Sequence, residues 1–152
     1  MRGIPGAGKN FTSETLTTPD NIFSADDYFM KDGEYRFDMN KLGEAHGWNN
    51  TRIEDAMIAE NPIVVVNNTN IREKDFNYYL NLAIDHGYDA KFVLPTSPWF
   101  REIYPRILDK SFTDDDVDVF FNKNVHGVPK DTIRRMMTLW SHVDEDKYKH
   151  DA

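Results

Sequence analysis

The chain has 152 residues, of which 39% are hydrophobic and 13% aromatic, and this is too rich in apolar residues for a disordered chain. The length predicts one compact domain, residues 1–152, that buries a hydrophobic core. The formal net charge of −8 argues against a general-purpose nucleic-acid binder, because such proteins are usually basic. A mean hydropathy of −0.67 and the lack of any run near ~20 apolar residues predict a chain without a membrane span.

The chain contains no cysteine, which excludes disulfides, thiolate zinc sites and cysteine nucleophiles. This composition fits a reducing compartment, so we expect a cytoplasmic protein. The first residues, Met1 to Gly6, include no apolar stretch of the length found in a signal peptide.

Strand and helix patterns alternate along the chain. We expect strands at residues 22–24, 63–66 and 90–94. We expect helices at residues 11–16, 40–60, 71–86, 99–108 with an interruption at Pro105, and 129–140, with an acidic helix start at 111–118. The unalternating run at 63–66 is typical of a parallel strand buried on both faces. The alternation predicts an α/β fold in which helices flank a mostly parallel sheet.

The segment Gly3-Ile4-Pro5-Gly6-Ala7-Gly8-Lys9 has the pattern G-x-x-x-x-G-K of a phosphate-binding P-loop. Its glycines let consecutive backbone N–H groups converge on an anion, and the following helix adds its positive end. Lys9 would place an ammonium between the β- and γ-phosphates. We therefore expect ATP or GTP to be bound by Gly3, Pro5, Gly6, Ala7, Gly8, Lys9, Asn10 and Phe11; an ordinary glycine turn is the alternative.

Asn10 departs from the P-loop pattern, because this position usually carries a Ser or Thr hydroxyl that ligates Mg²⁺. An amide oxygen can also bind Mg²⁺, directly or through water. Asn10 is therefore a candidate metal ligand.

Four motifs follow one another along the chain: Gly3 to Lys9, Ser24 to Phe29, Asn67 to Asn70, and His126 to Pro129. In this order they resemble the kinase-like P-loop NTPase family, which includes polynucleotide kinase-like and zeta-toxin-like ATP-binding domains. The stretch Asp32 to Asp38 is especially similar to the polynucleotide kinase-like domains of eukaryotic proteins. The resemblance covers residues 3 to about 140, and it implies a P-loop NTPase fold with a small helical lid at about 111–128.

The resemblance implies a phosphotransferase in which ATP or GTP, with Mg²⁺, phosphorylates a nucleotide or the 5′-hydroxyl end of an oligonucleotide. Asp26, the first aspartate of the D-D-Y motif, matches the general base of the family. Lys123 stands in the slot of a lid arginine that reaches the transferring phosphoryl group. Asn67 stands where the family carries an aspartate that holds Mg²⁺ through water or binds the substrate phosphate. Solvent-facing or helix-capping roles are the alternatives for these three residues.

Three further residues are candidates for contacts with the acceptor. Asp27 adjoins the expected base, and Arg52 lies on the helix that follows the D-D-Y motif. Arg36 lies in the turn most similar to the family. A guanidinium at either position could bind a substrate phosphate.

Three positions depart from the family pattern. A hydroxyl is missing at Asn10, a negative charge is missing at Asn67, and the two-pronged donor of an arginine is missing at Lys123. These losses favour a second hypothesis, a nucleotide-binding protein with degenerate or lost catalysis. Lys9 and Asp26 are retained, which favours an active kinase. A toxin-like kinase that acts on a sugar nucleotide would share the same P-loop. The acidic balance favours a short acceptor, and the compact kinase pattern suits a phage or bacterial host.

Overall fold

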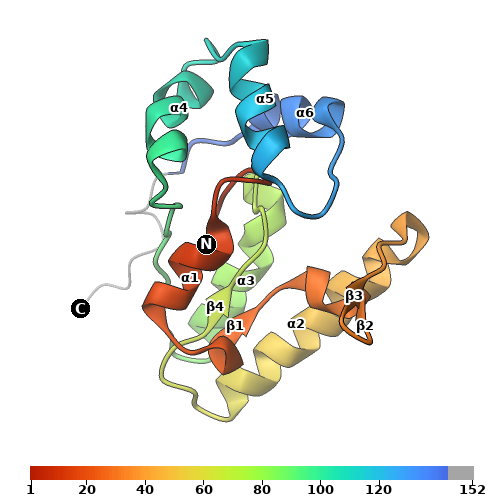
Figure 1. Cartoon of the computed structure of the whole chain (residues 1–152). Coiled ribbons are helices and arrows are strands. Elements are labelled where there is room, and N and C mark those ends of the chain that lie inside the picture. Colours follow the sequence, from red (N-terminus) through yellow and green to blue (C-terminus); the bar gives the residue numbers. More distant parts are fainter. Residues whose placement is uncertain (144–152) are drawn as a thin grey trace.

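The computed structural model describes residues 1–143, and the charged tail from Glu145 lies outside this range. The helices and strands, drawn in Figure 1, are α1 (Lys9–Leu16), β1 (Ile22–Phe23), β2 (Met30–Lys31), β3 (Glu34–Tyr35), α2 (Leu42–Ile58), β4 (Val65–Val66), α3 (Glu73–Asp85), α4 (Pro98–Leu108), α5 (Asp114–Lys123) and α6 (Lys130–Leu139). Short 3-10 helices are η1 (Pro19–Asn21), η2 (Ala25–Phe29) and η3 (Met39–Lys41). Within residues 1–143, no helix has the length and apolar character needed to cross a bilayer.

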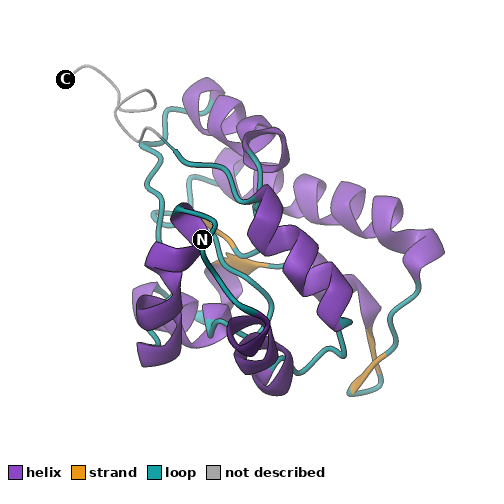
Figure 2. Cartoon of the chain, turned by 90° about the horizontal axis from the view of Figure 1, so that it is seen from above, coloured by secondary structure: helices purple, strands orange, loops and turns teal. Residues whose placement is uncertain are grey.

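The strands are short, and they form two separate pairs. β1 and β4 are parallel, with Ile22 opposite Val65, and Figure 2 shows this pair among the surrounding helices. β2 and β3 form an antiparallel hairpin, with Met30 opposite Tyr35. The helices and strands fit an α/β fold, whereas the mostly parallel sheet that we expected is not confirmed, because only β1 and β4 pair in parallel.

Backbone hydrogen bonds place the segment before the P-loop beside the β1–β4 pair. The N–H of Gly3 donates to the carbonyl of Thr69 (3.0 Å), and the N–H of Arg2 donates to the carbonyl of Val93 (2.9 Å). The expected strand at residues 90–94 is wrong, because these residues run as irregular backbone. A regular strand needs repeated ladder bonds, and the bond from Arg2 to Val93 is a single one.

The helix α4 is continuous, so the expected interruption at Pro105 is also wrong. Pro98 lies in the first turn of the helix, where the missing N–H costs little. Pro105 removes one bond from the helix interior, but Phe100, Ile103 and Ile107 on the same helix are buried. Burial of this apolar face holds the helix together across the proline.

Two clusters of buried side chains surround the P-loop and the β1–β4 pair. The larger one joins the P-loop to α4, α5 and α6, and consists of Ile4, Ala7, Ile71, Phe100, Ile103, Ile107, Val117, Phe120, Ile133, Met137 and Trp140. The second one joins β1 to α2 and α3, and consists of Phe23, Ile53, Ala56, Met57, Leu82 and Ala83. The P-loop is thus anchored to the larger cluster by two of its own side chains, Ile4 and Ala7, which are buried there.

The acidic start of α5 is held by Asp116, which is only 6% exposed. Asp116 and Thr113 form a reciprocal capping box, in which each side chain accepts from the backbone N–H of the other residue. Arg106 of α4 donates to both carboxylate oxygens of Asp116, at 2.8 and 2.7 Å. The expected lid is therefore tied to α4 at its first turn.

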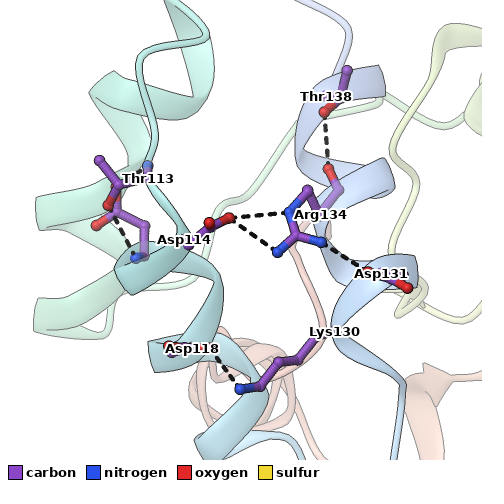
Figure 3. Close-up of polar contacts among 8 residues, drawn as sticks. Thr113, Asp114, Asp118, Lys130, Asp131, Arg134 and Thr138 are labelled. Carbon is purple, nitrogen blue, oxygen red and sulfur yellow. Dashed lines mark hydrogen bonds and ion pairs between the residues drawn. The ribbon is translucent and has the colours of Figure 1, made fainter.

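Ion pairs at the surface link α5 to α6, as Figure 3 shows. Arg134 pairs with Asp114 (3.0 Å), and Lys130 pairs with Asp118 (2.8 Å). These groups are exposed, so salt screens the pairs and each contributes little to stability. They keep the two helices aligned without adding to the core.

We predict that Asp116→Ala lowers the free energy of unfolding by about 1–2 kcal/mol, because the capping box is lost. Asp115→Ala, which removes an exposed carboxylate from the same turn, should change it by less than about 0.5 kcal/mol. Chemical denaturation of both variants measures the difference. The Arg106 guanidinium holds the pKa of Asp116 below its ordinary value of 3.8. Because the folded pKa is the lower one, the stabilisation is present above about pH 4, and it is lost as the pH falls through the folded pKa.

Candidate functional site

The P-loop backbone takes a path that requires glycine at two positions. Gly6 (φ 83°) and Gly8 (φ 88°) lie in the left-handed region. A Cβ atom at Gly6 would also overlap the carbonyl oxygen of Phe120 in α5. Glycine at this position therefore permits both the turn and its close packing against α5.

Side chains that follow the expected strand at 90–94 hold the carbonyl groups of the loop. The indole N–H of Trp99 donates to the carbonyl of Gly6 (2.9 Å), and the hydroxyl of Ser97 donates to the carbonyl of Ala7 (2.9 Å). With these carbonyls engaged, the loop fits an arrangement in which N–H groups face an anion. The sequence did not single out Ser97 for this role, and the only signal was its place before Pro98.

Lys9 begins α1, and its side chain lies back along the P-loop. Its ammonium contacts the carbonyl of Ile4 at 3.4 Å, and the side chain is partly buried. Burial lowers the pKa of Lys9 to about 8, and the negative charge of Asp26 opposes this effect. The expected phosphate-binding cation and the expected base therefore lie within electrostatic reach of each other.

Two segments distant in the sequence meet at Asp26, which η2 places after the end of β1. The hydroxyl of Tyr35 in β3 donates to Asp26 Oδ1 (3.3 Å), and Nε2 of His126 lies 3.8 Å from Oδ2. The rings of Tyr35 and His126 are in contact, with centroids 4.1 Å apart. Burial and the nearby carboxylate raise the pKa of Tyr35, so this hydroxyl remains a donor. Sequence reasoning missed both partners of Asp26, although each lies within a motif of the family resemblance.

Asp27 and Arg52, both expected at the acceptor side, form an ion pair at 3.2 Å. The guanidinium of Arg52 lies 3.9 Å from the ring centroid of Trp48, and it donates to the side chain of Asn49 (2.7 Å). These contacts fix Arg52 beside the D-D-Y motif. The structure therefore brings together two of the three expected acceptor contacts.

Asn10, which follows the P-loop lysine, is hydrogen-bonded to Asn67. The amide of Asn67 donates to Asn10 Oδ1 at 2.7 Å, and the hydroxyl of Ser13 donates to Asn67 Oδ1 at 3.2 Å. Asn67 is 4% exposed. The capping role considered for Asn67 is wrong, because Arg72 occupies the N-cap position of α3.

The donor set around these amides determines how Mg²⁺ could be held. In residues 1–143 no group of three or more His, Asp or Glu side chains is arranged so that it could hold a metal ion. Asn10 is exposed, and its amide oxygen keeps a second lone pair beyond the bond from Asn67. These residues fit a metal held mainly by nucleotide phosphates and water, with one amide oxygen from the protein.

The remaining expected site residues lie at the edge of this arrangement. Lys123 lies over the ring of Trp99, with its ammonium 4.1 Å from the ring centroid, so one side chain separates it from Gly6. Arg36 is exposed on the hairpin and pairs with Glu34 at 3.0 Å. Phe11 is exposed on α1. Lys123 is thus near the P-loop, whereas Arg36 is paired with Glu34 of β3.

Comparisons with known proteins show which family this chain resembles. The model of a family described as "AAA domain" matches residues 1–137. NEDD4-binding protein 2 of Homo sapiens is 36% identical over 141 residues, which are 90% of this chain and 7% of that protein. The chain therefore spans a small part of this relative. Because the relative is a human protein, the comparison does not support the expected phage or bacterial host. No solved structure matches the chain.

The family match covers the P-loop, the D-D-Y segment and the expected lid, which are the elements that converge around Lys9 and Asp26. It confirms the coarser part of the resemblance, a kinase-like P-loop protein, and leaves the subfamily as a prediction. The chain belongs to the AAA domain family of P-loop NTPase-like proteins.

Proposed function

We propose that this protein is an ATP- or GTP-dependent phosphotransferase whose acceptor is a nucleotide or the 5′-hydroxyl end of an oligonucleotide. The observation that supports it best is the setting of Asp26. Its carboxylate is oriented by Tyr35 and His126, and it lies within electrostatic reach of Lys9. A protein that only bound a nucleotide would need the lysine but not an oriented carboxylate beside it.

In the proposed reaction, the loop N–H groups and Lys9 bind the β- and γ-phosphates of the donor. The acceptor hydroxyl oxygen forms a bond to the γ-phosphorus, the bond to the β–γ bridging oxygen breaks, and Asp26 accepts the hydroxyl proton. Tyr35 donates to Oδ1 of Asp26, so the acceptor hydroxyl would donate to Oδ2, which lies 3.8 Å from Nε2 of His126 and accepts no hydrogen bond from it. Lys9 stabilises the negative charge on the phosphoryl oxygens in the transition state. Mg²⁺, held by Asn10 and the phosphates, would supply further charge neutralisation.

A second candidate is a nucleotide-binding protein without transferase activity. The Asn10–Asn67 pair favours it, because two neutral amides stand where a hydroxyl and a carboxylate would bind metal more strongly. Transfer of labelled γ-phosphate to 5′-hydroxyl oligonucleotides or nucleoside monophosphates supports the first proposal. Nucleotide binding without transfer to any acceptor supports the second.

We predict that Lys9→Ala abolishes nucleotide binding or transfer, because the ammonium and the loop amides act on one triphosphate. In the unchanged protein, nucleotide affinity should fall as the pH rises above about 8, since the charged lysine is the form that binds. Lys9→Arg is the control for charge, because arginine stays protonated and the decline above pH 8 should disappear. Calorimetric titration between pH 6.5 and 9.5 measures both effects. Unchanged affinity and turnover in Lys9→Ala would contradict the P-loop assignment.

We predict that Asp26→Asn lowers the transfer rate by roughly 10²–10⁴ with nearly unchanged nucleotide affinity, which is the usual effect of losing a positioned base. Asp27→Asn is the matched control, since it removes the adjacent carboxylate and the pair with Arg52. It should reduce transfer less than Asp26→Asn does. Single-turnover rates and nucleotide Kd values for both variants test this. Equal losses would indicate a shared metal site, and an unaffected Asp26→Asn would mean that another group is the base.

We predict that Asn10→Ser strengthens Mg²⁺-dependent nucleotide binding by about tenfold, because a hydroxyl restores the missing ligand. Asn10→Ala is the matched control, because it also removes the partner of Asn67 but adds no hydroxyl. Nucleotide titrations with and without Mg²⁺ give the metal-dependent part. If Asn10→Ser and Asn10→Ala behave alike, position 10 does not contact the metal.

A further inference from the structure

A pocket of about 570 Å³ opens between α2, α3, α6 and the loop that follows β4. In Figure 1, α6 lies above α2, and the upper end of α3 lies near α6. None of the P-loop residues lines this pocket. Its volume is in the range of small-molecule sites, and it is large enough for one nucleotide.

The lining combines aromatic side chains with positive charge. Arg72 lines the pocket from the N-cap of α3 and Arg135 from α6, and the two tyrosines of α3 that line it are Tyr78 and Tyr79. Asp75 lies 3.7 Å from Arg72 and partly neutralises it. Arg135 is exposed and forms no ion pair with any residue in the range 1–143. An uncompensated guanidinium beside tyrosine rings suits a phosphate that carries a base.

The pocket is connected to the expected base through Asn68. Asn68 lines the pocket, and its Oδ1 accepts a hydrogen bond from the N–H of Ala25 at 3.0 Å. Ala25 immediately precedes Asp26. The next residue after Asn68, Thr69, also lines the pocket and accepts the backbone bond from Gly3. Two residues of the pocket wall are therefore hydrogen-bonded to the backbone of the P-loop and of the residue before Asp26.

We propose that this pocket binds the second nucleotide of an oligonucleotide acceptor, with Arg135 on the phosphodiester and Tyr78 on the base. This inference rests on the proposed transferase function, and it narrows the acceptor to chains with at least one internucleotide phosphate. The net charge of −8 repels long polyanions, whereas Arg135 and Arg72 provide positive charge locally. A short 5′ end fits both properties better than a long duplex.

The test is direct binding of a 3′-labelled, 5′-hydroxyl trinucleotide in the absence of donor nucleotide, in RNA and DNA forms. Arg135→Ala should weaken binding by about tenfold or more, as expected for a lost charge-assisted bond. It should also reduce the slope of log affinity against log salt by about 0.7, the value for one phosphate on a single strand. Arg101→Ala is the matched control, because it removes an exposed arginine of α4 that does not line the pocket. It should leave both quantities unchanged.

A second variant tests the stacking contact independently. Tyr78→Ala should weaken trinucleotide binding by about fivefold or more, while Tyr78→Phe should bind as the unchanged protein does, because the ring is retained. In transfer assays, the trinucleotide should have a KM at least tenfold below that of a nucleoside, and Arg135→Ala should remove most of this difference. Binding of the RNA trinucleotide, the DNA trinucleotide or both supports the proposal, because both contain the phosphodiester that Arg135 would bind.

Equal effects of Arg135→Ala and Arg101→Ala would overturn the pocket proposal, as would equal KM values for nucleoside and trinucleotide. Either result would leave the transferase function intact. Conversely, absence of transfer to every acceptor would overturn the transferase function. In that case the binding measurements would still decide whether the pocket holds an oligonucleotide end.

Discussion

The close approach of the Gly6 backbone to the carbonyl oxygen of Phe120 is the constraint on which the site depends. Any side chain at Gly6 would separate the P-loop from α5. Phe120 is itself fully buried in the cluster that contains Ile4 and Ala7. The curvature of the phosphate loop, the position of α5 and the packing of the larger core are therefore set together.

The candidate metal ligands of this site are neutral amides, where a hydroxyl and a carboxylate would be expected. Asn10, Asn67 and Ser13 satisfy one another by hydrogen bonds instead of presenting a carboxylate. A buried carboxylate at position 67 would carry a desolvation cost without a cation beside it. The amide avoids that cost, and in exchange it leaves the nucleotide phosphates to provide most of the charge that attracts a divalent ion. The free protein thus keeps a well-satisfied interior at the expense of metal affinity.

Local patterns in the sequence predicted the P-loop, the helices around it and the position of Asp26 at the end of β1. These features depend on neighbours in the sequence: glycines before a lysine, apolar spacing in α3, a proline at the start of α6, and an acidic pair after a short strand pattern at residues 22–24. The partners of Asp26 could not be predicted, because Tyr35 and His126 come from segments 91 residues apart that meet only in the folded chain. The same holds for Lys123, whose place over Trp99 depends on how α4 and α5 pack. Residues 90–94 have a strand-like composition, but they do not form a regular strand. The prediction was wrong because a strand also needs hydrogen-bonding partners elsewhere in the chain.

Trp99 places an aromatic chromophore in contact with the P-loop. Its indole donates to the Gly6 carbonyl, and the Lys123 ammonium lies over its ring. The emission of an indole responds to a hydrogen bond at its nitrogen and to a nearby charge, and movement of either group would alter both. The protein therefore contains an intrinsic optical reporter of loop and lid geometry. With Trp48 and Trp140 replaced by phenylalanine, that reporter could be followed without any attached dye.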